Sequence, residues 1–277
     1  MSSYPVEPGT AVTAPVLEVF ASIQGEGLYA GHPQVFVRLR GCPMRCRWCD
    51  TPGSWTLDGE AEAQIAAPSG RRREPSASTP FQSACWIAEV ETGSPRTVSL
   101  TGGEPLLWPS FLLALKGMIG SRRLHLETAG GHPETLARVL ERCDHVSLDL
   151  KLPSDLDPPV ELDPASFEAG GMTSEPAPRD AQEWTLARRR CLRMLQDVDA
   201  CAKIVLAGGR GVREFDLLLE DMARLAPELP LFIQPVSPNS AVQAPTQAEI
   251  CDLMESARDL ELDVRVLPQI HRALRMP

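Results

Sequence analysis

The sequence predicts an α/β protein whose parallel sheet curves into a partial, open barrel of the (βα)6 type. Short apolar and β-branched runs alternate with helix-like stretches from about residue 34 to residue 267. Such alternation is typical of a parallel sheet with right-handed crossovers. There are about six repeats, fewer than the eight that close a full barrel, so one side should stay open.

Composition limits the kind of protein and the kind of partner. The chain has 277 residues, of which 43% are hydrophobic and 23% charged, so a globular core is expected. The net charge of −10 argues against nucleic-acid and membrane-surface binding, which leave a basic footprint. We therefore expect a small substrate, with a local cation for any anionic part of it.

The termini and cysteines indicate the compartment. The first residues show no basic segment followed by an apolar one, so no signal peptide is expected. No apolar run is long enough to span a membrane. The eight cysteines do not form a secreted disulfide pattern, because three are bunched and five are scattered. A reducing cytoplasm is the expected location.

The first elements lead to a cysteine loop. Residues 1–15 are expected to be a flexible lead-in, and residues 16–277 a single domain. A strand at 16–20 runs into a glycine-rich turn that carries Gln24 and Glu26. This turn alone would be ordinary surface structure. A second strand, 34–40, carries Arg38 on an alternating face, where it is either exposed or paired with an anion in the interior.

Three cysteines follow that strand directly, at Cys42, Cys46 and Cys49. Thiolates are soft ligands that suit zinc, copper(I) and iron–sulfur clusters. A zinc half-site or a thioredoxin-like redox pair is an alternative. Zinc would require a second pair, but the next cysteine, Cys85, stands alone; a redox pair would not need Cys42. The pattern favours a cluster with one open coordination position.

The middle of the chain combines insertions with βα units. Residues 58–80 read as a mobile insertion with solvated arginines, and residues 154–180 as a second insertion without assigned structure. A Gly102-Gly103-Glu104 turn ends a strand that begins at residue 97. Further strands are expected at 123–127, 145–150, 201–206, 230–235 and 263–267. Helices are expected at 81–91, 108–120, 133–143, 182–197, 211–225 and 246–260, the last with a capping box of Thr246 and Glu249.

Polar motifs gather where strands end. In open βα barrels the active site lies at the C-terminal ends of the strands. Six motifs of this chain fall at such ends: Gln24 with Glu26, the cysteine loop, Thr101 to Glu104, Glu127 with Thr128, Asp149 with Lys151, and Gln234. Their convergence on one rim is not readily explained as surface chemistry.

The three-cysteine spacing followed by Gly-Gly-Glu-Pro resembles the radical S-adenosylmethionine (SAM) superfamily. More narrowly, the chain resembles the 7-carboxy-7-deazaguanine synthase family over about residues 16–272, outside the insertions. The segments that carry this resemblance are Ser22 to Gly27, Val35 to Arg38, Cys46 to Thr51, Thr101 to Pro105, Glu127 to Gly130, Ser147 to Lys151, Gln234-Pro235 and Gln269 to Arg272.

The resemblance implies a reaction. Three cysteines would hold a [4Fe-4S] cluster, and SAM would chelate its fourth iron. Reductive cleavage of SAM gives a 5′-deoxyadenosyl radical. It would remove hydrogen from C6 of 6-carboxy-5,6,7,8-tetrahydropterin, whose ring contracts with loss of ammonia to 7-carboxy-7-deazaguanine, on the route to queuosine.

The same resemblance implies roles for individual residues. The cluster ligands would be Cys42, Cys46 and Cys49. The SAM-binding candidates are Gly102, Gly103, Glu104, Glu127, Thr128, Ser147, Asp149 and Lys151. The pterin-binding candidates are Ile23, Gln24, Glu26, Arg38, Thr101, Gln234, His271 and Pro277. The family uses Mg²⁺ near the substrate carboxylate, for which the Thr51 hydroxyl is the matching ligand.

The sequence also leads to expectations about partners, the C-terminal tail and alternative functions. A homodimer and an electron donor such as flavodoxin are implied by the resemblance. The C-terminal tail is expected to pack at the active site, with the Pro277 carboxylate close to substrate. The rivals are another small radical SAM enzyme, such as a glycyl-radical activase, and a non-enzymatic zinc- or cluster-binding module.

Overall fold

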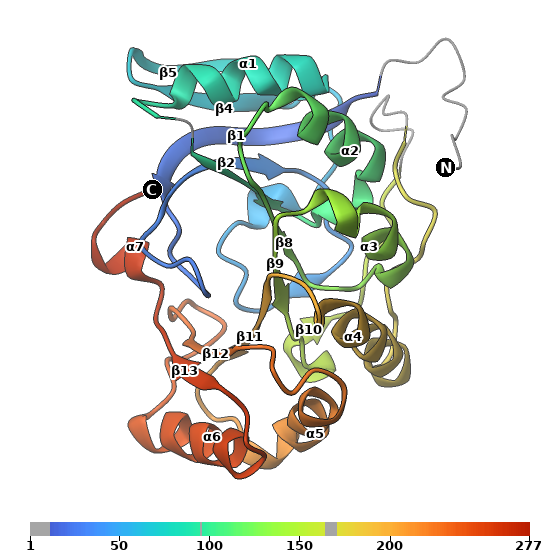
Figure 1. The fold of residues 1–277 in the computed structure, drawn as a ribbon, viewed down its shortest axis with the longest axis vertical. Helices are drawn as coiled ribbons and strands as arrows, with labels where there is room; N and C mark the ends of the chain where they lie inside the picture. Colours follow the sequence, from blue (N-terminus) through green and yellow to red (C-terminus); the bar gives the residue numbers. More distant parts are fainter. Residues whose placement is uncertain (1–11, 95, 164–170) are drawn as a thin grey trace.

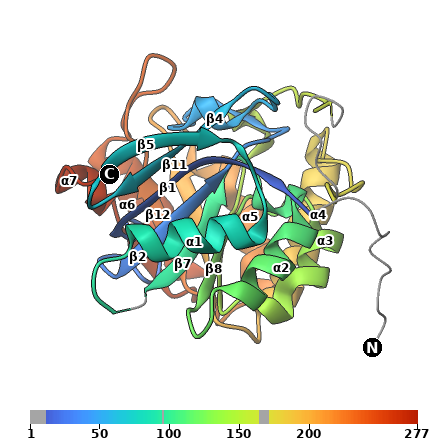
Figure 2. The ribbon, with the colours of Figure 1, turned by 90° about the horizontal axis from the view of Figure 1, so that it is seen from above.

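The computed structural model describes residues 12–94, 96–163 and 171–277. One large sheet runs through it in the order β13-β12-β11-β9-β8-β7-β2-β1-β4-β5. From β2 to β13 every neighbouring pair is parallel. The sheet curves without closing on itself, with helices on its outer face (Figures 1 and 2). The predicted partial barrel is confirmed.

Strands and helices alternate as the sequence indicates. The parallel strands are β2 (Pro33–Leu39), β7 (Thr97–Gly102), β8 (Leu124–Thr128), β9 (His145–Asp149), β11 (Ala200–Leu206), β12 (Leu231–Pro235) and β13 (Val264–Val266). The helices between them are α1 (Pro80–Val90), α2 (Pro109–Met118), α3 (Pro133–Val139), α4 (Ala181–Leu195), α5 (Asp216–Leu225) and α6 (Gln247–Asp259).

The core lies between the sheet and the helices. Phe111, Leu112 and Leu115 of α2 are each at most 1% exposed. Burying such a side chain contributes roughly 1.5–3 kcal/mol. The indole N–H of Trp108, just before α2, donates to the carbonyl of Arg40 at 2.9 Å. The loop before α2 is therefore tied to the residue that precedes the cysteine loop.

Helix starts follow local chemistry. Thr246 and Glu249 form the predicted capping box at α6, since the Thr246 hydroxyl accepts from the Glu249 N–H at 3.2 Å. The expected helix over 133–143 ends earlier, at Val139, and continues as a short 3₁₀ turn, Leu140–Arg142. A tightened last turn of this kind is common where orphan carbonyls need partners.

The first strand is longer than expected and opposite in direction to its neighbour. β1 (Ala14–Ile23) pairs antiparallel with β2 and parallel with β4 (Glu62–Ala67). Its start falls within the expected lead-in of residues 1–15, of which 1–11 lie outside the described residues. This pairing extends the sheet beyond the barrel, toward the end of the molecule that carries α1 (Figure 1).

The prediction of a mobile insertion at 58–80 is wrong. These residues form a hairpin of β4 with β5 (Gly70–Pro75), followed by the short β6 (Ala77–Ser78). Ala63 and Ile65 are fully buried in the core. Arg72 is not simply solvated, because its Nη2 donates to Glu89 of α1 at 2.8 Å. The edge strand is stabilised by tertiary contacts that local composition does not reveal.

The second insertion has a structural role next to the cysteines. Its β10 (Leu156–Asp157) pairs antiparallel with β3 (Arg45–Cys46) of the cysteine loop. The Val160 N–H donates to the Pro43 carbonyl at 2.9 Å. We call residues 155–160 the strap. Residues 164–170 of this insertion lie outside the described residues.

The C-terminal segment crosses the open side of the barrel. After β13, α7 (Ile270–Ala273) leads back toward the end of β1 (Figure 1). The Ile270 N–H donates to the Gly25 carbonyl at 3.1 Å, and the Ser22 hydroxyl donates to the Pro277 carbonyl at 2.7 Å. Within the described ranges, no helix combines the length and apolarity that a membrane crossing requires.

Candidate active site

A pocket opens at the C-terminal ends of the barrel strands, between the cysteine loop and the C-terminal segment. It is lined by residues from widely separated parts of the chain: Phe20, Ile23, Gln24, Gly25, Glu26, Phe36, Arg38, Cys42, Met44, Cys46, Trp48, Cys49, Asp50, Ser54, Trp55, Thr101, Gly102, Gly103, Glu127, Thr128, Ala129, Asp149, Lys151, Lys203, Val205, Gln234, Val236, Ser237, Gln269, His271, Arg272 and Pro277. The predicted rim is therefore the rim of the observed pocket.

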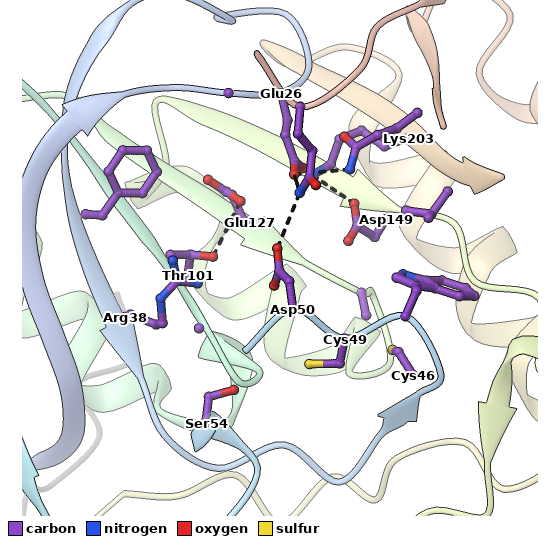
Figure 3. A pocket seen from close by; sticks show the side chains of 18 of the residues that line it. Glu26, Arg38, Cys46, Cys49, Asp50, Ser54, Thr101, Glu127, Asp149 and Lys203 are labelled. Atoms are coloured by element: carbon purple, nitrogen blue, oxygen red, sulfur yellow. Dashed lines mark hydrogen bonds and ion pairs between the residues drawn. The ribbon is translucent and has the colours of Figure 1, made fainter. Parts of the chain in front are cut away.

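The cysteine loop forms the floor of this pocket in Figure 3, where Cys46 and Cys49 lie below Asp50. Cys42 is buried, and the other two thiols are half-buried. Burial is the largest effect on the pKa of all three thiols and raises it. Thiolates would not persist here without cations, so the loop suits a cluster whose irons stabilise the deprotonated sulfurs.

The fit to a cluster can be tested against the spacing of the ligands. Among the residues that the structure describes, no three His, Cys, Asp or Glu side chains converge on one ion position. Such convergence is what a zinc site requires. Ligands of an iron–sulfur cube bind different iron atoms, so they line a wall rather than meet at a point. The donor set itself, three soft thiolates on one loop, is one that suits an iron–sulfur cluster.

The glycines after β7 are required by backbone packing. Gly102 has φ +118°, and a Cβ there would lie 2.3 Å from the Leu39 carbonyl oxygen. A Cβ at Gly103 would lie 2.1 Å from the Gly41 carbonyl oxygen. The Glu104 N–H also donates to that carbonyl at 2.8 Å. The turn thus lies directly against the start of the cysteine loop, with room for backbone only.

Glu104 lies behind the pocket wall. Its carboxylate is 1% exposed and accepts from the Thr128 hydroxyl at 2.7 Å and the Ala129 N–H at 3.0 Å. It also accepts from the Leu106 N–H at 3.0 Å. Burial raises its pKa. Glu104 therefore fixes the ends of β7 and β8 relative to each other, whatever it does for a ligand.

Four other SAM-binding candidates do line the pocket: Glu127, Thr128, Asp149 and Lys151. Asp149 accepts from the Lys151 ammonium at 2.9 Å. Ser147 is not on the wall. Its hydroxyl lies 2.8 Å from Nε2 of His125, in a buried polar layer beneath the pocket.

The pterin-binding candidates all line the pocket. Gln24 donates to Glu127 at 2.9 Å, and the Thr101 hydroxyl lies 3.4 Å from the other oxygen of that carboxylate. Arg38 pairs with Glu18 at 2.8 Å, so its charge is already compensated on one side. Of the two positions that the sequence left open, Arg38 takes the paired one and is partly buried.

An aromatic wall completes this half of the pocket. Phe20 and Phe36 stack with ring centroids 5.2 Å apart and an angle of 12° between planes. The Arg38 guanidinium lies 5.8 Å from the Phe20 ring centroid. A flat apolar face beside a cation suits a planar substrate that carries a carboxylate.

Thr51 lies just outside the wall, and its neighbour Asp50 lies on it. The Thr51 hydroxyl donates to Asp50 at 2.9 Å. Burial alone would raise the pKa of Asp50, but the charge of Arg38 and hydrogen bonds from Thr51 and Gln269 outweigh it and lower the pKa. Asp50 therefore presents an ionised carboxylate to the pocket.

The sequence interpretation missed Lys203. Its ammonium lies 2.6 Å from Glu26 and 3.0 Å from Asp149, on the side of the pocket opposite Arg38 and Thr101 (Figure 3). The sequence does indicate Lys203, because it is a lone charged residue within an apolar strand. In the structure all of β11 is buried. Asp50, Gln269 and Arg272 also line the pocket without having been assigned roles.

The sequence of this chain is similar to a known protein family and to known enzymes. Residues 36–168 match the family model described as the Radical SAM superfamily. A 7-carboxy-7-deazaguanine synthase from Methanothermobacter thermautotrophicus is 33% identical over 269 residues, covering 94% of this chain and 97% of that protein. The enzyme of the same name from Methanopyrus kandleri is 33% identical over 275 residues, covering 93% and 92%.

Solved structures show the same fold. The crystal structure of QueE from Escherichia coli has a TM-score of 0.55 at 21% identity, covering 92% of this chain and 93% of that one. A radical SAM methyltransferase from Sphaerobacter thermophilus has a TM-score of 0.56 at 14% identity, covering 87% and 67%.

An open barrel with three thiols beside a polar pocket defines a radical SAM enzyme. The similarity over nearly the whole chain narrows this class: the chain belongs to the 7-carboxy-7-deazaguanine synthase family.

Proposed function

We propose that this enzyme converts 6-carboxy-5,6,7,8-tetrahydropterin to 7-carboxy-7-deazaguanine with loss of ammonia, by radical ring contraction, in 7-deazapurine (queuosine) biosynthesis. The observation that carries the proposal is the pocket itself. It combines the three-cysteine loop with a carboxylate-binding cation, Arg38, and a stacked aromatic wall. Family membership supplies the identity of the reaction.

The residues divide into two halves. Cys42, Cys46 and Cys49 would hold the [4Fe-4S] cluster, and together with SAM it supplies the 5′-deoxyadenosyl radical. The SAM side is Gly102, Gly103, Glu127, Thr128, Asp149 and Lys151, with Glu104 and Ser147 supporting it from behind. The pterin side is Ile23, Gln24, Glu26, Arg38, Thr101, Gln234, His271 and Pro277.

The pterin side has the donors and acceptors that this substrate requires. Glu26 can accept from the amino and ring N–H groups of the pterin, and Arg38 can pair with its carboxylate. Gln234 donates to Glu26 at 3.1 Å, which orients the carboxylate before substrate arrives. Residues of the C-terminal segment line this half of the pocket.

A Mg²⁺ ion would be held where Asp50 and Thr51 meet. Hard cations prefer oxygen ligands, and Mg²⁺ accepts few from protein while keeping waters and substrate oxygens. The Thr51 hydroxyl and the Asp50 carboxylate are 2.9 Å apart and supply such oxygens. The predicted Thr51 ligand thereby gains a candidate partner.

Of the remaining partners, the electron donor follows from the chemistry of this proposal. A one-electron donor such as flavodoxin would reduce the cluster. The family resemblance, rather than the chemistry, implies a homodimer in the cytoplasm. All eight cysteines are free thiols, which suits a reducing compartment.

The deciding assay uses anaerobically reconstituted protein, SAM, a reductant and the pterin. Formation of 7-carboxy-7-deazaguanine is expected, and Cys46→Ala protein should form none. A protein that cleaves SAM but leaves the pterin unchanged would favour another radical SAM activity. A colourless protein that retains zinc and never cleaves SAM would favour a binding module.

A further inference from the structure

Lys203 is a buried cation on β11, a strand whose other residues are apolar. β11 is buried along its whole length, and the Lys203 side chain is 4% exposed. An ammonium in such a place is costly unless it is paired and hydrogen-bonded. A strand that only had to pack would gain from an aliphatic residue at this position.

Its two partners belong to different halves of the pocket. The Lys203 Nζ donates to Oε2 of Glu26 at 2.6 Å and lies 3.0 Å from Oδ1 of Asp149. Glu26 stands on the glycine-rich turn that follows β1, on the pterin side. Asp149 ends β9, on the SAM side, where its other oxygen accepts from Lys151. Figure 3 shows Lys203 between the two carboxylates.

Positive and negative charges alternate along a line of four side chains that leads from the SAM side to the pterin side: Lys151, Asp149, Lys203 and Glu26. Burial alone would lower the pKa of Lys203, but the carboxylates of Asp149 and Glu26 outweigh it and hold the pKa well above its ordinary value. Lys203 therefore stays charged. The far end of the line is also anchored, because Gln269 donates to the other oxygen of Glu26 at 2.7 Å.

Lys203 lines the pocket between the two halves and pairs with one carboxylate from each of them. When Asp149 moves or binds a ligand more tightly, the position of the ammonium that Glu26 also binds shifts, because one ammonium serves both carboxylates. At low effective dielectric, such close pairs interact strongly.

We propose that Lys203 is a positioning residue that couples the two halves, so that SAM on the Asp149 side strengthens pterin binding on the Glu26 side. The inference rests on the proposed function, because it uses the pterin as the second ligand. Coupling of this kind is reciprocal, so pterin strengthens SAM binding by the same factor.

The experiment measures that factor without turnover. Reconstituted holoenzyme, kept anaerobic and without reductant, is titrated with 6-carboxy-5,6,7,8-tetrahydropterin in the absence and presence of saturating SAM. The ratio of the two Kd values is the coupling factor. We expect about 10 in the wild type, within the range usual for coupled sites. In Lys203→Gln the ratio should fall to below about 2.

Two further variants keep the test decisive. Lys116→Gln removes a lysine whose partner, Asp144, lies 2.5 Å away and outside the pocket, and its ratio should stay at the wild-type value. Asp149→Asn breaks the same line from the SAM side and should also lose the ratio. It replaces Lys203→Gln if that variant does not fold, at a SAM concentration shown to saturate it, because Asp149 is also a SAM-binding candidate.

Two results would overturn the inference: a wild-type ratio of 1, or the full wild-type ratio in folded Lys203→Gln (in Asp149→Asn if Lys203→Gln does not fold). Turnover of the wild type, assayed in the same preparation, distinguishes failure of the coupling from failure of the proposed function. Product formation with a ratio unaffected by Lys203→Gln overturns the coupling alone. Absence of product from the wild type overturns the function on which the coupling rests.

Discussion

The guanidinium of Arg272 lies 3.2 Å from the Asp50 carboxylate, which joins the C-terminal segment to the cysteine loop across 222 residues of sequence. Gln269 reaches the same carboxylate at 3.3 Å. The segment that covers the pterin side thus contacts the loop that would carry the cluster.

Removing the C-terminal segment should abolish turnover while leaving the barrel folded. Truncation after Leu267 deletes Gln269, His271, Arg272 and Pro277 from the pocket wall but keeps β13. We expect turnover to fall more than about 100-fold, which corresponds to the loss of roughly 3 kcal/mol of substrate and transition-state contacts. Steady-state assays and a thermal melt check this. Undiminished turnover in the truncated protein would show that the segment is only a tail.

Replacement of Arg38 should weaken pterin binding selectively. A charge-assisted hydrogen bond contributes about 1.5–3 kcal/mol, so Arg38→Gln should raise the pterin KM by about 10- to 150-fold. SAM affinity should change little. The matched control is Arg190→Gln, whose exposed pair with Glu134 lies outside this pocket. Equal KM values for Arg38→Gln and wild type would contradict the assigned role.

The strap should protect the cluster. Asp155 is 4% exposed and pairs with Arg210, and its carbonyl accepts from the Arg47 N–H at 3.1 Å. Arg210 keeps Glu214 as a second carboxylate partner at 2.9 Å, so the substitution mainly removes the ion pair that holds Asp155 and the strap in place. Asp155→Asn should therefore loosen the cysteine loop and lower iron retention after brief exposure to air.

The control for the strap is Asp157→Asn. Its pair with Arg47 is about half exposed on both sides, and such surface pairs contribute about 0–1 kcal/mol. Iron content and the rate of cluster bleaching are the readouts. Identical bleaching rates in Asp155→Asn and wild type would mean that the strap does not shield the cluster.

Lowering the pH should show how much the ion pairs of Asp149 stabilise the fold. Burial alone would raise its pKa, but the charges of Lys151 and Lys203 lower it to about 2, against an unfolded value of about 3.9. A depressed carboxyl pKa stabilises the fold above the unfolded pKa, and that stability is lost as pH falls through the folded pKa. The contribution is of order 2–3 kcal/mol.

The measurement compares the free energy of unfolding of wild type and Asp149→Asn. Their difference should be constant above about pH 5 and should shrink as pH falls from about 4 toward 2. A difference that does not change over this interval would show that Asp149 is not held ionised by the two lysines.

The fold was predictable where local pattern and tertiary structure agree. The parallel strands β7, β8, β9, β11 and β12 are mostly buried and rich in apolar residues, so they stand out in the sequence. The hairpin of β4 and β5 does not, because its buried alanines depend on pairing with β1, 46 residues earlier in the sequence (Glu18 opposite Gln64). The strap was equally invisible, since β10 pairs with only the two residues of β3.

The sequence predicts which face of a strand carries the site, but not how far along the strand the pocket reaches. Alternation places Ser147 and Asp149 on the same face of β9, yet only Asp149 reaches the pocket. Ser147 lies lower, next to His125, because it sits nearer the N-terminal end of the strand. Glu104 looked like a free ligand, but backbone N–H groups already bind it. Lys203 could have been found from the cost of its charge in an apolar strand.

The most direct test of the central claim follows one hydrogen atom. Pterin deuterated at C6 is incubated with reduced enzyme and SAM, and both the product and the 5′-deoxyadenosyl group are analysed by mass spectrometry. We expect 7-carboxy-7-deazaguanine and deuterium on the 5′ carbon of the nucleoside or of recovered SAM. Cleavage of SAM with no deuterium on that carbon and no product would contradict it.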